Sequence, residues 1–414
     1  MIAIDKLPRL LWSQLPRRVR LSLFTQVTRA LMPRTVCAVP AVEPITVIGV
    51  LSSTTGLGEG ARLNLDALAR LGYDIRYFDL APAFRQQDMA ETDWPGSPMT
   101  EGPGIALIHV NPHVLPYALC RIGARRLKGK RIIGYWAWEL PEIPPAWRQV
   151  LDCVDELWVP SVFTANAIRP FTSKAVHVVH HPVALRPPVA RTCLRARLGI
   201  APEQFAVLTM FHMGSCFERK NPLDAIRAFR AAFGDREDAT LLVKVADAEV
   251  QPWAAGQLRE MIGNSPNIKV ITEKFSRQGI ADLIGSADVV LSLHRSEGFG
   301  LVMAEAMLLG RSVVATKWSA NVEFMDETLS ELVPCTMVPA NDPQESYLQS
   351  HLKWAAPDVA AAAAALRRLH ADPVRARHRG RLSSEKVSAV LGLEAFRAAI
   401  APSLFAPKGC CPGP

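Results

Sequence analysis

Short apolar runs alternate with amphipathic stretches along most of the chain. The first run, residues 45–51, is rich in β-branched side chains, which predicts a buried strand. In the helical stretch that follows, Ala61, Leu65 and Leu68 share one face, and Gly72 is its expected end. Further strands are predicted in this half at residues 75–80, 105–110, 131–135, 156–159 and 176–179. Strands that alternate with helices predict a parallel sheet covered on both faces.

The pattern weakens between residues 182 and 202, where prolines and arginines indicate a linker or a domain edge. The second half then repeats the alternation, and Asn221 and Pro222 fit the N-cap and first position of its first helix. Its strands are predicted at residues 205–211, 241–245, 268–271, 289–293 and 313–316, with later helices over 360–369 and 383–400. Two consecutive α/β units of this size predict a ligand cleft between them.

The length of 414 residues is enough for two or three domains. We expect a basic N-terminal segment (1–40), an N-terminal domain (41–195), a C-terminal domain (196–382) and a terminal helix with a tail (383–414). With 49% hydrophobic and 21% charged residues, the composition excludes a mostly disordered chain. No uninterrupted apolar stretch reaches the ~18 residues that span a bilayer, so an integral membrane protein is not expected. The eight scattered cysteines form no C-x-x-C pair, which argues against a disulfide framework and a zinc site and favours the cytoplasm.

The net charge of +8 is concentrated at the N-terminus. Between Met1 and Pro40, Asp5 is the only acid among seven lysines and arginines, and apolar side chains such as Trp12 and Phe24 lie between them. This combination predicts peripheral contact with an anionic membrane surface. A leader packed on the protein's own surface and a disordered arm are the open alternatives. Beyond residue 40 the charges alternate in sign, so nucleic acid is not an expected partner.

A glycine-rich segment with Gly56, Gly58 and Gly60 follows the first predicted strand. Closely spaced glycines let backbone N–H groups approach an anion at a helix N-terminus, and Asp79 ends the next strand as a dinucleotide fingerprint requires. However, the spacing is G-x-G-x-G, and Glu59 would place negative charge beside a pyrophosphate. A nicotinamide-dinucleotide site and a tight turn without a ligand both stay open here.

Two cations, Arg219 and Lys220, stand just before a predicted helix in the second half. The helix dipole favours anions at this end, so the pair could clamp a diphosphate. A solvated pair of charges is the competing interpretation.

Two glutamates eight positions apart, Glu297 and Glu305, bracket a predicted helix start near Gly300. Free N–H groups at that start can receive phosphate oxygens, and carboxylates accept hydrogen bonds from sugar hydroxyls. If the interval were fully helical, the acids would be ~12 Å apart, on either side of a bound diphosphate. Surface glutamates on an ordinary helix are the alternative, but Glu305 lies among apolar residues, where an unpartnered acid is costly.

This stretch resembles the E-x7-E motif of the retaining glycosyltransferases of family 4. The similarity extends to SCFERKNP, DELWVPSVFTANAI, VVATKWSANVEFM and GYWAWELPEIPPAW, and covers roughly residues 45–400. It implies an α/β protein of the GT-B fold, with two Rossmann-like domains facing across a cleft. The N-terminal domain would bind the acceptor, and the C-terminal domain a nucleotide-sugar such as GDP-mannose or a UDP-sugar.

The resemblance also implies roles for individual residues. Glu297 would hold donor-sugar hydroxyls, Glu305 the ribose, and Lys220 the leaving diphosphate. The family often has an arginine five residues before this lysine, where this chain has Ser215, so Arg219 is the substitute cation. Residues expected to bind the donor are Gly298, Phe299, Gly300, Leu301, Glu305 and Ser215, with the amides of 299–301 at the diphosphate. Those expected at the acceptor side of the cleft are Gly56, Gly58, Gly60, His109 and Asn111.

Cleavage of the anomeric bond places negative charge on the diphosphate and positive charge on the sugar. Cations and a helix N-terminus aimed at the phosphates stabilise that change, and no D-x-D motif is placed to hold a metal, so no metal or other cofactor is expected. The resemblance implies transfer with retention to a lipid-linked or polysaccharide acceptor at the cytoplasmic face of a membrane. A non-catalytic sugar-nucleotide-binding or scaffold protein and a dinucleotide-dependent oxidoreductase are the competing classes.

Overall fold

The computed structural model describes Gln26 and residues 42–89, 93–189, 191–344, 347 and 351–405. Apart from Gln26, the segment 1–40, with the membrane contact expected there, therefore falls outside the described residues, as does the tail from residue 406 onward.

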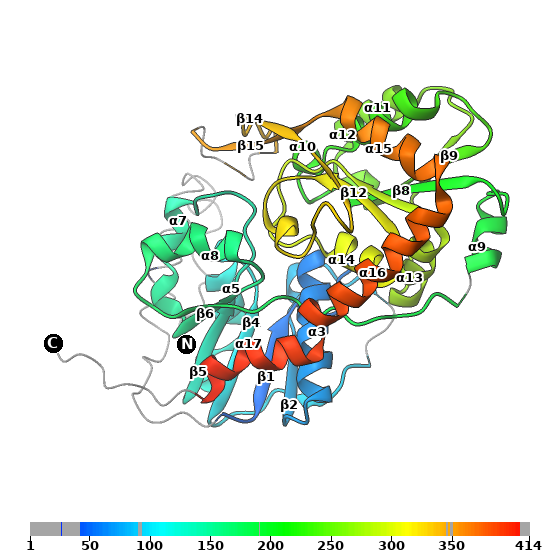
Figure 1. The fold of residues 1–414 in the computed structure, drawn as a ribbon. Helices are drawn as coiled ribbons and strands as arrows, with labels where there is room; N and C mark the ends of the chain where they lie inside the picture. Colours follow the sequence, from blue (N-terminus) through cyan, green and yellow to red (C-terminus); the bar gives the residue numbers. More distant parts are fainter. Residues whose placement is uncertain are drawn as a thin grey trace.

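The N-terminal half forms a seven-stranded parallel sheet in the order β3-β2-β1-β4-β5-β6-β7 (Figure 1). Alternate side chains along its strands enter two cores, so that Val47 of β1 packs beneath one face and Ile48 beneath the other. The strands are β1 (Ile45–Gly49), β2 (Ile75–Asp79), β3 (Ser97–Pro98), β4 (Gly104–His109), β5 (Lys130–Tyr135), β6 (Glu156–Val159) and β7 (Val176–Val178). The helices are α3 (Gly56–Arg70), α4 (Ala81–Phe84), α5 (Leu115–Ile122), α6 (Ala124–Leu127), α7 (Pro145–Arg148), η2 (Leu151–Cys153), α8 (Val162–Ile168) and η3 (Arg169–Phe171).

The C-terminal half forms a six-stranded parallel sheet in the order β10-β9-β8-β11-β12-β13 and an antiparallel hairpin, β14-β15. Its strands are β8 (Phe205–His212), β9 (Ala239–Ala246), β10 (Ile268–Ile271), β11 (Val289–Ser292), β12 (Ser312–Thr316), β13 (Glu331–Val333), β14 (Cys335–Pro339) and β15 (Lys353–Pro357). Its helices are α9 (Arg191–Arg197), α10 (Phe217–Lys220), α11 (Pro222–Phe233), η4 (Ala248–Val250), α12 (Pro252–Ile262), α13 (Arg277–Ser286), α14 (Leu301–Leu308), η5 (Ala320–Glu323), α15 (Val359–Ala371) and α16 (Pro373–Leu391).

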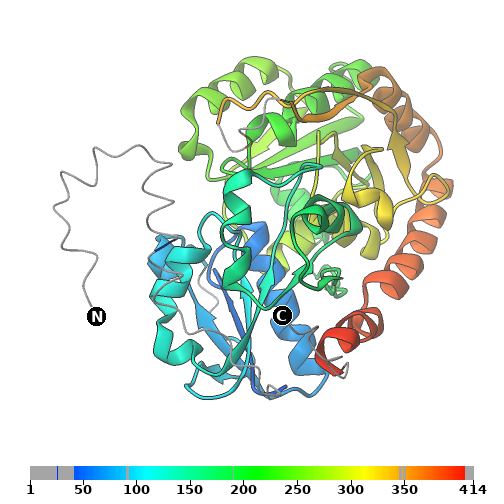
Figure 2. The same cartoon turned by 90° about the vertical axis from the view of Figure 1, so that its left-hand side faces the viewer.

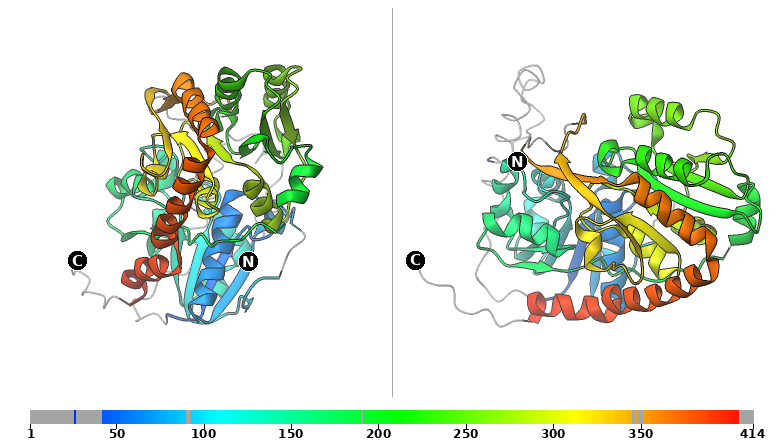
Figure 3. Two further views of the ribbon diagram at one scale, coloured as in Figure 1. Left: turned by 45° about the vertical axis from the view of Figure 1, so that its right-hand side comes forward. Right: turned by 45° about the horizontal axis from the view of Figure 1, so that its top comes forward.

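The predicted strands are confirmed to within about two residues at each end. The strands that the sequence did not reveal, β3, β13, β14 and β15, are short edge or hairpin strands without a long apolar run. The prediction of one last helix over residues 383–400 is wrong, because α16 ends at Leu391 and α17 (Leu393–Phe405) begins after Gly392. Figures 1 and 3 show α16 beside the C-terminal sheet and α17 beside the N-terminal sheet.

Among the described residues, the helical segment Pro373–Phe405 is the one that is long and apolar enough in composition to cross a membrane. Part of its apolar surface packs inside the protein: Val387 and Leu391 join the core of the C-terminal domain, and Ile400 and Leu404 join that of the N-terminal domain. Val374, Leu382 and Phe405 are exposed.

Each sheet has a point at which the strand order reverses, between β1 and β4 in one and between β8 and β11 in the other. Ligands of open α/β sheets bind beyond the carboxyl ends of the strands at such points. Residues of both domains line a cleft of 1720 Å³ there, between the two lobes seen in Figure 2. The expected architecture of two Rossmann-like domains facing across a cleft is confirmed.

Candidate active site

The loop after β8 brings Lys220 and Arg219 to the floor of the cleft on the short helix α10. Left-handed Asn221 (φ 52°) ends α10 and occupies the N-cap position of α11, as predicted. Its side chain does not cap α11, however, because its amide donates to Asp224 and to the carbonyl oxygen of Leu293. Asn221 thus fixes the end of the loop to the neighbouring strand rather than the start of the helix.

Glu297, in the loop after β11, meets both cations. Its Oε1 is 2.5 Å from Lys220 Nζ, and its Oε2 is 3.2 Å from Arg219 Nη1. Burial raises the pKa of Glu297, but the charges of Lys220, Arg219 and His294 outweigh burial and hold it at about 2. Burial lowers the pKa of Lys220. The structure therefore brings together the acid and the two cations that the sequence nominated separately.

Arg219 is 4% exposed and has most of its hydrogen-bonding capacity committed. Its Nη1 donates to the carbonyl oxygen of Ser296 (2.8 Å) and its Nη2 to that of Ser215 (3.1 Å). Ser215, at the position where the family often has arginine, lines the cleft. Arg219 thus connects the loop after β8 to the loop after β11, and Lys220 is the more accessible cation.

The N-terminus of α14 opens into the cleft, as expected from the sequence. Gly300 has φ 103°, which favours glycine, and it precedes the first turn. Within the described residues, the amides of Phe299, Gly300 and Leu301 have no acceptor, and all three residues line the cleft. Gly298 lies against the opposite domain, because a Cβ there would be 2.9 Å from the carbonyl oxygen of Trp138. The start of α14 therefore presents free amides to the cleft, where a helix N-terminus favours an anion.

Glu305 lies in the second turn of α14 and lines the same cleft. Its side chain is half-buried and, within the described part of the chain, has no hydrogen-bond or ion-pair partner. Burial raises its pKa to about 8, and the nearby charge of Glu59 adds to the effect. The interval from Glu297 is not fully helical, since α14 begins only at Leu301, so the helical separation assumed from the sequence does not apply.

The glycine-rich segment is helical and not a loop, which corrects the sequence interpretation. Helix α3 begins at Gly56, and Thr55 caps it by accepting from the amide of Gly58. Gly56 lines the cleft, whereas a Cβ at Gly58 would be 2.6 Å or less from two backbone oxygens and a Cβ at Gly60 would be 2.4 Å from His181. The last two glycines therefore serve close packing.

The two polar candidates at the end of β4, His109 and Asn111, lie in different surroundings. His109 is 1% exposed, stacks on Tyr135 at 4.3 Å and does not line the cleft, so the acceptor-side prediction for it is wrong. Burial holds its pKa well below the usual range, so it is neutral. Asn111 lines the cleft and accepts a hydrogen bond from the amide of Ala137.

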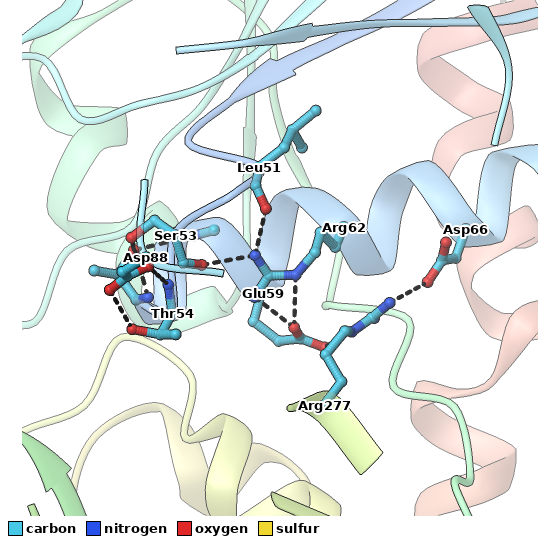
Figure 4. Close-up of polar contacts among 10 residues, drawn as sticks. Leu51, Ser53, Thr54, Glu59, Arg62, Asp66, Asp88 and Arg277 are labelled. Carbon is cyan, nitrogen blue, oxygen red and sulfur yellow. Dashed lines mark hydrogen bonds and ion pairs between the residues drawn. The ribbon is translucent and has the colours of Figure 1, made fainter. Parts of the chain in front are cut away.

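A second charged cluster, which sequence reasoning missed, joins the domains (Figure 4), and its charges influence the pKa of Glu305. Arg277 at the start of α13 pairs with Glu59 (3.0 Å) and Asp66 (3.1 Å) of α3. Glu59 also pairs with Arg62, which donates to two carbonyl oxygens at the end of β1. Two guanidinium groups thus neutralise Glu59, and the pairing with Arg277 is one that its position in the sequence did not indicate.

The described residues contain no group of three or more histidine, cysteine or acidic side chains that could hold a metal ion. The absence of a metal requirement stays a prediction.

Residues 165–391 match the family model described as Family 4 Glycosyltransferase in conflict systems. This match covers more than half of the chain. The chain belongs to this family. The matched region contains both cations, both glutamates and the start of α14, so the family assignment and the geometry of the cleft agree.

A curated relative, a D-inositol 3-phosphate glycosyltransferase of Jonesia denitrificans, is 29% identical over 181 residues. The match spans 41% of each chain. Solved structures extend the likeness to both domains: HepE of Anabaena (TM-score 0.63, 14% identical) and sucrose-phosphate synthase of Thermosynechococcus elongatus (TM-score 0.62, 18% identical). Each covers 88% of this chain and 99% of its own. At these identities the likeness shows the fold, which is GT-B.

Proposed function

We propose that this protein transfers a hexose from a nucleotide-sugar to a lipid-linked or polysaccharide acceptor, with retention of configuration. The observation that carries the proposal is the site at the reversal of the second sheet. There the carboxylate of Glu297 holds Lys220 and Arg219 beside the unpartnered amides at the start of α14. The family match supports glycosyl transfer, and HepE was solved with UDP-glucose, which supports a UDP-sugar as the first donor to test; GDP-mannose is the second.

The site can stabilise the charge that develops as the anomeric bond breaks. The amides of α14 and Lys220 face the leaving diphosphate, and a helix N-terminus and a cation are both favourable to that charge. Glu297 is ionised under neutral conditions because its pKa is about 2, so it can accept hydrogen bonds from sugar hydroxyls. Glu305, which lines the same cleft, would meet the ribose, and the acceptor would enter from the side of Gly56 and Asn111.

The dinucleotide-dependent oxidoreductase is the weakest alternative. Asp79, the acid that would hold the ribose of a dinucleotide, already accepts hydrogen bonds from Ser52 and from the amide of Ala81. A non-catalytic sugar-nucleotide-binding scaffold uses the same cleft and differs only in turnover.

One experiment separates the three classes. Purified protein is incubated with a panel of nucleotide-sugars, with and without lipid-linked and polysaccharide acceptors, and nucleoside diphosphate release is measured beside NADH oxidation. We expect diphosphate release that an acceptor accelerates. Binding without release would support the scaffold, and NADH oxidation the oxidoreductase. The anomeric configuration of the product, read by NMR, tests retention.

We also propose that the enzyme acts at the cytoplasmic face of a membrane, with residues 1–40 as the contact. The support is the basic, Trp- and Phe-containing sequence, in which each cation near an anionic surface contributes about 1 kcal/mol. Co-sedimentation with anionic vesicles should fall steeply with salt. A variant that starts at Ala41 should lose this binding; equal binding would show that the segment is not the anchor.

A further inference from the structure

Glu139 brings a carboxylate to the donor side of the cleft from the opposite domain. It lies in the loop between β5 and α7, and its side chain is 21% exposed. Its Oε1 is 3.8 Å from Arg219 Nη2, and its Oε2 accepts a hydrogen bond from the hydroxyl of Tyr347 at 3.1 Å. Burial raises the pKa of Tyr347 well above its usual range, so the phenol is protonated and donates. The carboxylate is thereby directed at Arg219.

Arg219 has two acids beside it, and they come from different domains. Glu297 belongs to the same domain as Arg219 and is shared with Lys220, which is the closer cation. When Glu297 turns to hydroxyl groups of a donor sugar, Arg219 loses counter-charge on that side. A buried guanidinium without a counter-charge is unfavourable. Glu139 supplies the compensating charge.

We propose that Glu139 is a positioning residue, which balances Arg219 from across the cleft and so frees Glu297 for the donor sugar. This inference rests on the proposed glycosyl transfer and adds to it a residue of the N-terminal domain that acts on the donor. Glu139 lines the cleft, and the role we propose for it is exerted through Arg219.

The contact between Glu139 and Arg219 also depends on the two domains lying against each other across the cleft. The carbonyl oxygen of Glu139 accepts a hydrogen bond from the hydroxyl of Ser296, which immediately precedes Glu297. The neighbouring carbonyl oxygen of Trp138 approaches Gly298 so closely that a side chain there would collide. Both backbone contacts hold the Glu139 loop against the Glu297 loop. These contacts keep the second negative charge beside Arg219 at the donor site.

The test compares Glu139→Gln with Glu142→Gln, a matched control in the same loop. Glu142 is 46% exposed, does not line the cleft, and its carboxylate contacts only His351 among the described residues. Calorimetry gives the dissociation constants for UDP and UDP-glucose, and for GDP and GDP-mannose, and the ratio within each pair reports what the sugar contributes. Steady-state kinetics with the donor that wild type uses best give kcat and KM.

For Glu139→Gln we expect nucleoside diphosphate affinity within twofold of wild type, because the amides of α14 and Lys220 are untouched. The affinity gained from the sugar should fall at least fivefold, and kcat at least tenfold, while Glu142→Gln stays within twofold throughout. An unchanged sugar contribution and an unchanged kcat would overturn the inference. An equal loss of nucleoside diphosphate and nucleotide-sugar affinity would also overturn the inference, because Glu139 would then only help to hold the two domains together. If wild type neither binds nor turns over any donor, the proposed function itself fails, which the wild-type measurement alone reveals.

Discussion

Replacing Glu305 by glutamine should stabilise the protein in a manner that depends on pH. The pKa of Glu305 is about 8 in the folded protein against an ordinary value of 4.5. In the unfolded chain the carboxyl ionises above pH 4.5, whereas in the folded protein it stays neutral until about pH 8. Between these values the unfolded state binds fewer protons, so the folded state loses stability as pH rises.

The size of this effect follows from the same difference. At 1.36 kcal/mol per pH unit, the difference between the two pKa values corresponds to a loss of about 5 kcal/mol of stability at and above pH 8, which is an upper limit. Glu305 is half-buried and faces a cleft that water enters, so we expect about 2 kcal/mol after solvent screening. Glutamine has nearly the same shape and no charge at any pH. Glu305→Gln should therefore match wild type near pH 4.5 and exceed it by about 2 kcal/mol at pH 8.

Urea unfolding followed by tryptophan fluorescence, at pH 5 and pH 8, measures this difference. The exposed Glu385→Gln on α16 is the control and should match wild type at both pH values. A stability gain of equal size at both pH values would refute the electrostatic reasoning, as would a variant less stable than wild type at pH 8. The same substitution should weaken nucleotide-sugar binding if Glu305 holds the ribose, so stability and binding should change in opposite directions.

Three further substitutions test the donor site. Glu297→Gln should lower kcat far more than it weakens nucleoside diphosphate binding, as measured by steady-state kinetics beside calorimetry; near-normal turnover of the folded variant would remove Glu297 from the mechanism. Lys220→Ala should weaken nucleoside diphosphate binding by about 1.5–3 kcal/mol, the scale of a charge-assisted contact. An unchanged dissociation constant would show that Lys220 is a solvated charge that does not bind the diphosphate. Gly298→Ala places a methyl group 2.9 Å from the carbonyl oxygen of Trp138, so it should hinder closure and reduce kcat/KM at least tenfold with little change in urea stability. Wild-type kcat/KM in this last variant would show that the close approach is not needed for activity.

The sequence by itself determined the features that depend on residues close together along the chain. Apolar runs located the buried strands, because a strand covered on both faces needs apolar side chains throughout. The spacing from Glu297 to Glu305, and the glycine before α14, located the anion site at a helix start. The sequence also nominated Lys220 and Arg219 from their place before a helix, although it left a solvated pair of charges as an equal alternative.

The tertiary structure decided which of these groups meet. Lys220 and Glu297 are 77 positions apart, and they pair because β8 and β11 are neighbours where the strand order of the sheet reverses. Glu59 and Arg277 are 218 positions apart and come from different domains. His109 stands at the end of a strand, as a cleft residue should, yet its ring stacks in the core. Local periodicity records whether a side chain is buried, but strand order and domain closure set its partner, because those contacts join segments that no short stretch of sequence contains.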